Sequence, residues 1–409
     1  MARGLNNQKM QQVNRSLILS LILEHPGISR LELAQITGLQ KPTITNIVNE
    51  LLTLGVVDNC EKPKIENQKK TKGLVFADDT IGILSVRLMR NEFDAALFTI
   101  KGQIVDQRKM EVNPNRDIER TLAEATNIIN EILNQNSLKV LAMSLGLPGP
   151  YIRGIDGNDR IIVEGFSQLG KIDVAGYFRK KYSFPVIAEH DAHLSALCEW
   201  KNMSSTEREH VHCLLALQSI GIGIGAGLIL NGKVLEGAFG IAGEIGNIGI
   251  YFNGPKNSNG ERGTFEHYAS TGNMKNYIAQ RLAEFPSSKL TEESSYEEIK
   301  QAYFERDSLA VWAFEAVAMK LAYGLASVIP VINPDKIVIG PDYPEDENFI
   351  NRIKNDLAGM INTEISDRID IRFSEIRTDP TLLGGYEFVL QKFMEESALV
   401  DRIRALLST

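Results

Sequence analysis

Cysteine, tryptophan and long apolar runs are all scarce in this sequence of 409 residues. The three cysteines, Cys60, Cys198 and Cys213, are too far apart to form a CxxC metal clip. So few scattered thiols exclude a disulfide scaffold and fit a reducing compartment, where a thiol serves as a small apolar residue. With 43% hydrophobic and 23% charged residues, the composition also excludes a collagenous or wholly disordered chain.

Two segments bear on membrane contact. The N-terminal residues MARGLNNQKMQQVNRS contain no apolar core of secretory length, so we expect no signal peptide. Residues 213–230 are nearly uncharged and about long enough to span a bilayer. Glycines at 221, 223, 225 and 227 alternate with apolar residues there, which instead predicts a buried strand pair with a glycine-rich turn. We therefore predict a cytoplasmic protein that does not contact a membrane.

Positive charge is concentrated near the N-terminus, although the whole chain carries a net charge of −8. Residues 1–75 contain ten basic and six acidic side chains, a net +4 that leaves −12 for the rest. At about 150 residues per domain, the length predicts two to three domains. A small basic unit on a large acidic body predicts that only the N-terminal part meets a polyanion.

Three helices are predicted in the first 55 residues. Apolar side chains recur at helical spacing over residues 8–24, and Pro26-Gly27 follow. Ser29 and Glu32 form a capping box for a second helix that stops at Gly38, and Pro42 suits the first turn of a third. The apolar stripes comprise Met10, Val13, Leu17, Ile18, Leu21 and Ile22, then Leu31, Leu33 or Ala34, and Ile36, then Ile44, Ile47, Val48, Leu51 and Leu52.

A capped helix, a tight turn and a helix, followed by strands at 55–57 and 73–77, predict a winged helix-turn-helix over residues 1–78. Such a unit places its third helix in the major groove. Lysines of the wing, the loop over residues 61–73, neutralise phosphates. A three-helix protein-interaction module is the alternative, but the lysine-rich wing and nearly acid-free helix face favour duplex operator DNA. The predicted DNA contacts are Lys41, Thr43, Thr45, Asn46, Asn49, Lys62, Lys69, Lys70 and Lys72.

Residues 79–409 alternate strand clusters with helices twice over. This pattern predicts an α/β domain of two lobes, each with a mixed sheet, and a ligand cleft between them. The expected strands are 81–88, 92–100, 104–112, 140–150, 185–191, 214–218, 223–230, 336–340 and 369–376, and the expected helices are 118–135, 173–182, 192–200, 271–284 and 307–327, with further helices at the C-terminus.

Five motifs follow the winged helix in order: GLPGP (146–150), AEHDAH (188–193), GIGIGAGLILNGKVLEG (221–237), GEIGN (243–247) and NGERGTFEHYAS (259–270). Together they resemble the ROK family (repressors, open reading frames, kinases) over nearly the whole chain. The resemblance implies an actin-like, ribonuclease-H-like sugar-kinase fold of two lobes behind the winged helix-turn-helix. That combination is similar to the family's sugar-responsive transcription regulators, such as the N-acetylglucosamine and xylose repressors.

The resemblance also implies a sugar site. Asp191 matches the kinase carboxylate that accepts the proton of a sugar hydroxyl, and Glu244 and Glu266 match two glutamates that bind sugar hydroxyls. Gly165 matches a glycine that lies against the sugar. Helix caps or surface charges are the alternative roles for the three acids. The sugar's identity stays open, because His190 replaces the kinases' asparagine and Asn247 replaces a histidine that touches sugar.

The family's zinc and phosphate motifs are not conserved in this chain. Asn247, Asn257, Asn259 and Thr264 stand where the family has one histidine and three cysteines, so we predict no metal. Residues 84–88, LSVRL, replace the DxGxT turn that helps to hold magnesium and phosphate, and Pro341-Asp342-Tyr343 replace glycines on the adenosine side. We therefore predict no kinase activity and no cofactor.

The combined prediction is a transcriptional repressor of carbohydrate genes that a sugar or sugar-phosphate effector modulates. A homodimer is expected, because one winged helix contributes little affinity and operators are commonly two-fold, and a tetramer is left open. Two alternatives remain: an ATP-dependent sugar kinase with an appended DNA-binding unit, and a repressor controlled by a protein partner.

Overall fold

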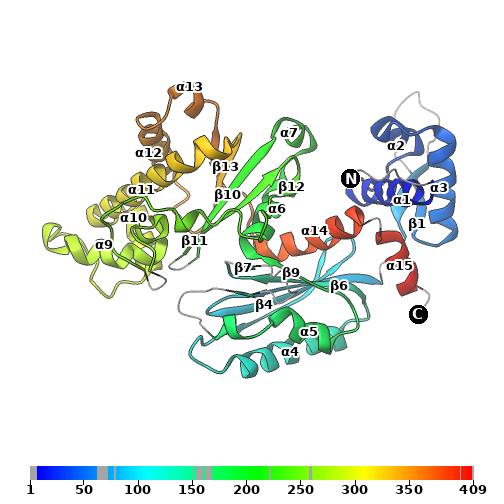
Figure 1. The fold of residues 1–409 in the computed structure, drawn as a ribbon, viewed down its shortest axis with the longest axis horizontal. Coiled ribbons are helices and arrows are strands. Elements are labelled where there is room, and N and C mark those ends of the chain that lie inside the picture. The colour runs from blue at the N-terminus through cyan, green and yellow to red at the C-terminus, as the bar shows by residue number, and fades with distance from the viewer. Residues whose placement is uncertain are drawn as a thin grey trace.

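The computed structural model describes residues 7–61, 72–77, 80–149, 151–152, 160–161, 168–220, 223–257, 260–396 and 398–407. The chain forms a head (7–77) and two lobes, each built on a five-stranded sheet (Figure 1). We call the lobe that follows the head the first lobe. The second lobe lies at the opposite end of the molecule from the head (Figure 1).

The head has the predicted order of helices and strands. It consists of α1 (Asn7–Glu24), α2 (Arg30–Thr37), α3 (Lys41–Thr53), β1 (Val57–Glu61) and β2 (Lys72–Phe76). The predicted capping box is present at Ser29, and Gly38 ends α2 in the left-handed conformation. Strands β1 and β2 pair antiparallel, which confirms a winged helix-turn-helix geometry. The predicted wing contacts Lys62, Lys69 and Lys70 lie outside the described residues.

Two of the three predicted helical stripes need correction. In α1, Ile18, Leu21 and Ile22 are buried, but Met10, Val13 and Leu17 are exposed. Met10 and Val13 lie in the first half of this helix of 18 residues, which is longer than the 13-residue α3 that packs on it. Leu17 lies one turn before Leu21, the least buried of the three buried residues, at the edge of the covered stripe. In α2, Leu33 is buried, but Leu31 and Ile36 are exposed. A helix of eight residues packed on one neighbour buries only a narrow stripe, and Leu31 lies on the opposite side from Leu33.

The first lobe contains the sheet β5-β4-β3-β6-β9. Strands β3, β4 and β5 are antiparallel neighbours, whereas β6 and β9 pair in parallel with β3 and with each other. Helices α4 and α5 cover one face of the sheet, and α14 covers the other (Figure 1). The elements are β3 (Ile81–Leu88), β4 (Glu92–Thr99), β5 (Ile104–Glu111), α4 (Ile118–Gln135), β6 (Lys139–Leu147), β7 (Tyr151–Ile152), β8 (Arg160–Ile161), η1 (Leu169–Lys171), α5 (Val174–Lys181), β9 (Val186–His190), α14 (Pro380–Glu395) and α15 (Leu399–Leu407).

The second lobe repeats this topology. Its sheet has the order β12-β11-β10-β13-β14, again three antiparallel strands followed by two parallel ones. The elements are α6 (Asp191–Asn202), α7 (Ser205–His210), β10 (Cys213–Ile220), β11 (Gly223–Leu230), β12 (Lys233–Val234), η2 (Ile245–Asn247), α8 (Phe265–Ala269), η3 (Thr271–Asn273), α9 (Met274–Arg281), η4 (Leu282–Glu284), α10 (Tyr296–Phe304), α11 (Ser308–Ile332), β13 (Lys336–Ile339), α12 (Glu347–Ala358), α13 (Thr363–Ser366) and β14 (Asp370–Phe373).

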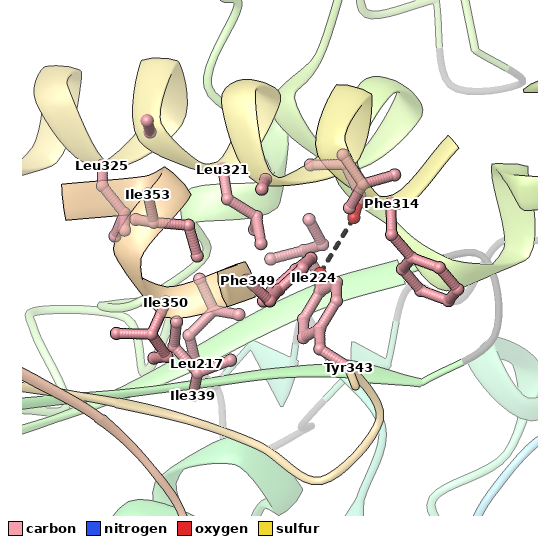
Figure 2. Packing of buried hydrophobic residues seen from close by; sticks show 14 of the residues in the cluster. Leu217, Ile224, Phe314, Leu321, Leu325, Ile339, Tyr343, Phe349, Ile350 and Ile353 are labelled. Atoms are coloured by element: carbon pink, nitrogen blue, oxygen red, sulfur yellow. Dashed lines mark hydrogen bonds between the residues drawn. The ribbon is translucent and has the colours of Figure 1, made fainter. Parts of the chain in front are cut away.

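Two apolar segments are part of the second lobe. Residues 213–230 form the antiparallel pair β10 and β11, which confirms the predicted strand pair. Helix α11 is long and apolar enough, by length and composition alone, to cross a membrane. Twelve of its residues from Leu309 to Ile329 are buried, and Leu321 and Leu325 pack against α12 and the sheet (Figure 2). Helix α11 is therefore the core helix of this lobe.

The apolar core of the head is continuous with that of the first lobe. Side chains of α1, α3 and β2 share one buried cluster with residues of α14 and α15. Leu74 and Phe76 on the head side and Leu399 and Ile403 on the lobe side are all buried in this cluster. The head therefore packs directly on the lobe that carries the beginning of the predicted sugar site.

Candidate functional site

The predicted sugar residues gather where the two lobes meet. Strand β9 ends at His190, and α6 begins at Asp191. These two side chains therefore lie at the end of a strand of the first-lobe sheet. His190 Nε2 lies 3.1 Å from Asp191 Oδ1 and 3.7 Å from Glu244 Oε1, an atom contributed by the second lobe. Both His190 and Asp191 are buried. The carboxylate of Asp191 also accepts the backbone N–H of Ala192 at 2.7 Å, which fixes its orientation.

Glycines bring Glu244 and Glu266 to this place. Gly243 has a φ of +93°, and a Cβ there would lie 2.1 Å from the carbonyl oxygen of Ala226 on β11. Only glycine fits this close approach, which directs the following Glu244 toward His190. Within η2, a Cβ on Gly246 would lie 3.1 Å from Glu266 Oε2. Glu244 therefore begins this short turn, and Glu266 lies against it.

A glycine that we did not assign to the site forms part of its wall. A Cβ on Gly149 would lie 2.2 Å from His190 Nε2 and 2.5 Å from Glu244 Oε1. Any side chain at this position would therefore displace the two groups that form the site. The GLPGP motif contained this signal, because a glycine after a buried strand often marks a close approach.

A second buried histidine, which we did not predict as part of the site, holds the site residues in place. His193 is fully buried, with Nδ1 3.1 Å from Glu189 Oε1 and Nε2 2.7 Å from the carbonyl oxygen of Ala242. The same Glu189 oxygen accepts the backbone N–H of His190 at 2.9 Å. His193 thus ties the start of α6 to the loop that carries Glu244. Its place in AEHDAH, four residues after Glu189 and next to the predicted sugar residues, was the available signal.

The electrostatics favour a charged imidazole beside carboxylates. Burial lowers the pKa of His190, but the hydrogen bond to Asp191 and the charges of Asp191, Glu244 and Glu189 outweigh it and raise that pKa to about 9. Burial raises the pKa of Glu244, and the His190 charge opposes that rise. His190 Nδ1 and Glu244 Oε1 are buried without a hydrogen-bond partner among the described residues. The site therefore offers a donor and an acceptor to a polar ligand.

Two predicted sugar contacts are less well defined. Asn247 ends η2 and is half-buried, within the same turn as Glu244. Gly165 lies outside the described residues.

Hydrogen bonds hold the loop where the resemblance places zinc ligands. Asn257 Nδ2 donates to Glu261 Oε2 at 2.8 Å, and the Glu261 N–H donates to Asn257 Oδ1 at 2.9 Å. The Arg262 guanidinium donates to the carbonyl oxygen of Gly254 at 2.9 Å. Thr264 is buried at the start of α8, and Asn259 lies outside the described residues. The described residues contain no cluster of three or more His, Cys, Asp or Glu that could hold a metal.

The residues that replace the phosphate turn lie on β3. Leu84, Val86 and Leu88 are all buried. Arg87 is partly buried, 2.5 Å from Asp379 Oδ2 at the start of α14 and 2.6 Å from Glu92 Oε1. This strand therefore presents a cation paired with the chain's own acids, where the kinases have an aspartate and small residues.

The adenosine-side turn is filled by the second-lobe core. Tyr343 is fully buried, stacks on Phe349 with ring centroids 5.7 Å apart, and donates its hydroxyl to the carbonyl oxygen of Ala269 at 2.9 Å (Figure 2). Burial raises the pKa of the neighbouring Asp342 to about 6, although the Ser219 N–H and the Lys300 charge oppose this rise. Tyr343 is thus part of the protein interior, whereas Asp342 is half-buried and Pro341 is exposed.

The predicted DNA-binding face lies on the solvent side of α3. Lys41, Thr45, Asn46 and Asn49 are exposed, and Thr43 is half-buried. Arg30 donates to Asn49 Oδ1 at 3.1 Å, so α2 helps to orient a side chain of this face. Lys72, the wing residue that is described, is exposed at the start of β2.

Comparisons with known proteins agree with this architecture. Residues 83–392 match the ROK family, and residues 14–58 match the winged helix-turn-helix DNA-binding family. The chain is 24% identical to the xylose repressor of Bacillus spizizenii over 94% of this chain and 97% of the relative. It is 25% identical to a glucokinase of Halalkalibacterium halodurans over 73% of this chain and 91% of that enzyme.

Solved structures show the same fold. A ROK family transcriptional regulator, described as a homologue of the E. coli MLC protein, superposes with a TM-score of 0.77 at 22% identity. That superposition covers 97% of this chain and 99% of the regulator. Together with the family match over most of the sequence, the fold leads to one conclusion: the chain belongs to the ROK family and carries an N-terminal winged helix-turn-helix.

Proposed function

We propose that this protein is a transcriptional repressor whose affinity for operator DNA is controlled by a sugar or sugar phosphate bound between the lobes. One observation carries the proposal. The groups suited to a polyol, His190, Asp191 and Glu244, lie together, and two of their buried polar atoms have no hydrogen-bond partner among the described residues. The phosphate turn, in contrast, is replaced by buried apolar residues and a paired arginine.

The chemistry of His190, Asp191 and Glu244 suits a carbohydrate. Sugar hydroxyls donate and accept hydrogen bonds, so they can satisfy both the acceptor Glu244 Oε1 and the donor His190 Nδ1. Glu266 and Asn247 lie around the same turn and provide further polar groups. The proposed sugar contacts are Gly165, His190, Asp191, Glu244, Asn247 and Glu266.

The chemistry of the residues that replace the phosphate turn argues against phosphoryl transfer. A kinase of this fold needs a carboxylate for magnesium and free backbone N–H groups for phosphate. Here Leu84 takes the place of that carboxylate, and Arg87 is neutralised by Asp379 and Glu92. Tyr343 fills the adenosine side. The site therefore favours binding of a sugar without its phosphorylation.

The head would bind the operator DNA. The exposed polar face of α3 would enter the major groove and read base edges, while Lys72 and the other wing lysines contact phosphates. A xylose repressor covers nearly the same length of chain, which supports this assignment. We extend the proposal to a cytoplasmic homodimer, whose two heads match two half-sites, and analytical ultracentrifugation tests that assembly.

Regulation would follow from the sugar's preference for one arrangement of the lobes and heads. A ligand shifts such an equilibrium only through its different affinities for the two states. We expect the sugar-bound state to bind the operator more weakly.

The experiment isolates operator fragments from genomic DNA and then titrates the complex with D-xylose, D-glucose, N-acetyl-D-glucosamine and their phosphates. We expect one of these compounds to weaken operator binding by about 5- to 150-fold, the usual range of allosteric coupling. The same compound should leave the Asp191→Asn variant on DNA. Operator binding that no compound changes would contradict the proposal.

A sugar kinase is the second candidate, because Asp191 keeps the position of the kinases' proton acceptor and a glucokinase is among the relatives. It predicts that the bound sugar becomes phosphorylated when ATP and magnesium are present. The repressor proposal predicts the same sugar unchanged.

A further inference from the structure

Helix α6 connects the proposed sugar site directly to the head. Its first residue is Asp191, and Lys201 lies ten residues later, about 15 Å along the helix axis. Every residue from Asp191 to Trp200 is buried. A displacement of the first turn therefore meets packed protein along the whole helix and is transmitted rather than absorbed.

Helix α6 is coupled to α14 by close backbone contact. A Cβ on Gly384 of α14 would lie 1.8 Å from the carbonyl oxygen of Leu194, so the two helices touch there. Ser195 Oγ and Thr381 Oγ1, one from each helix, lie 3.0 Å apart and are buried. Figure 1 shows α14 extending from the junction of the lobes toward the head. Helices α6 and α14 thus form a single rigid unit.

Lys201 joins this unit to the head. Its Nζ lies 3.2 Å from Glu24 Oε1, on the last residue of α1, and 3.5 Å from Glu387 Oε2 on α14. The Lys201 side chain is only 19% exposed, which strengthens both attractions relative to a surface pair. One ammonium group therefore contacts the head, the helix that begins in the sugar site and the helix that packs on it.

The surroundings of this contact leave room for the head to move. A cavity of about 330 Å³ lies beside Lys201, lined by residues of the head such as Ser20 and Leu23 and by Cys198 and Met394 of the lobe helices. Among the described residues, the head also contacts the lobe through the apolar cluster with α14 and α15, which has little directionality, and through a long hydrogen bond of 3.5 Å from Gln12 Nε2 to the exposed Asp401 Oδ2 on α15. The Lys201 ion pairs are thus suited to fix the orientation of the head.

We propose that Lys201 is the positioning residue through which occupation of the site at Asp191 reorients the DNA-binding head, by making or breaking its contact with Glu24. The inference rests on the proposed function, because it names the path by which the sugar controls operator affinity. Lys201 belongs neither to the predicted DNA-binding face nor to the proposed sugar site, so we expect it to act on the coupling between the two.

The test replaces Lys201 with methionine in the full-length protein, and Glu24 with glutamine in a second variant. Lys233→Met is the matched control, because Lys233 pairs with Glu395 of α14 at 3.1 Å, without the head in that pair. The measured quantity is the ratio of operator Kd with and without D-xylose, D-glucose or N-acetyl-D-glucosamine. Calorimetry on the free protein gives the sugar affinity separately.

We expect the wild-type ratio for the active sugar to lie between about 5 and 150, and Lys201→Met and Glu24→Gln each to reduce it below about twofold. The double variant should match the single variants, because both remove the same pair. Lys201→Arg should retain the coupling, Lys233→Met should keep the wild-type ratio, and sugar affinity should change less than about threefold in every variant.

The outcomes separate the two proposals. A Lys201→Met protein that binds sugar and operator and keeps the wild-type ratio would overturn the role of Lys201 while leaving the proposed function intact. A wild-type ratio of one with every sugar would contradict the proposed function and the inference together.

Amide hydrogen exchange of residues 18–25 tests the Lys201 contact with the head in the absence of sugar. Exchange should be faster in Lys201→Met and Glu24→Gln than in Lys233→Met, and equal exchange would also overturn the inference.

Discussion

The two sides of the junction between the lobes differ in how they use polar groups. On the side of the proposed sugar site, which we call the sugar side, His190, Asp191 and Glu244 are brought together and leave two buried polar atoms unpartnered among the described residues. On the phosphate side, Arg87 is paired with Asp379, and Tyr343 is packed in the core. Arg87 Nε is also buried without a hydrogen-bond partner among the described residues, but the charge of this arginine is paired with acids of the same chain. The proposed function assigns a ligand to the first side only. If the proposed function is correct, the comparison teaches that a kinase fold can keep its sugar-binding groups while the groups for phosphoryl transfer are replaced.

The largest effect is expected on the phosphate side. Tyr343→Ala should lower the free energy of unfolding by about 3–5 kcal/mol, because it leaves a cavity beside Phe349 in the core. Urea denaturation measures this change, and Tyr343→Phe, which loses only the hydroxyl contact with Ala269, should cost about 1 kcal/mol. A Tyr343→Ala protein that is as stable as wild type and binds ATP would show that this side is still a nucleotide pocket.

A second prediction concerns pH on the sugar side. The pKa of His190 is raised from 6.5 to about 9 in the native state, so its protonation stabilises the fold. This contribution is complete below pH 6.5 and is lost as the pH rises through 9, on the order of 3 kcal/mol in all. The free energy of unfolding should fall over that interval. The His190→Gln variant should lack this component, and an identical pH profile in both proteins would contradict the assignment.

The third prediction concerns ligand binding. Asp191→Asn should raise the Kd of the active sugar about 10- to 100-fold, because it removes a buried charged acceptor and the partner of His190. Calorimetry measures the Kd, and Asp370→Asn is the control, since that half-exposed carboxylate pairs with Lys336 on β13. Equal sugar affinity in the Asp191→Asn variant and wild type would show that the two sides of the junction do not differ as described.

The smallest effect is expected far from both sides, in the head. Lys72→Ala should weaken operator binding similarly for all sequences and reduce the slope of log Kd against log salt by about 1, because it removes one phosphate contact. Fluorescence anisotropy at several salt concentrations measures both quantities. Sugar affinity should not change, and an unchanged salt slope would mean that the wing does not reach the DNA backbone.

Much of the fold could be predicted from local patterns. The helix at 118–135, the capping box at Ser29 and the strand pair of residues 213–230 were predicted from periodicity and spacing, and the structure confirms them. Helix α12 was not predicted, although Phe349, Ile350 and Ile353 have helical spacing. The exposure of Leu31 and Ile36 was also missed, because the sequence does not show how little of a short helix its neighbour covers.

The site was predicted less completely, because several residues that hold it in place are distant from it in the sequence. The acids were predicted from the resemblance to the family, but Gly149 and the carbonyl of Ala242 reach the site only through tertiary contact. The pairing of Arg87 with Asp379 joins residues nearly 300 positions apart, and no local pattern reports it. The roles of these residues therefore required the folded arrangement.

Phosphoryl transfer is the most direct test of the difference between the two sides. Purified protein is incubated with magnesium, ATP labelled in its γ-phosphate and the sugar that releases it from DNA, and labelled sugar phosphate is measured over time. We expect the sugar to bind and no labelled sugar phosphate to accumulate above a protein-free control. Repeated turnover to sugar phosphate would contradict the account.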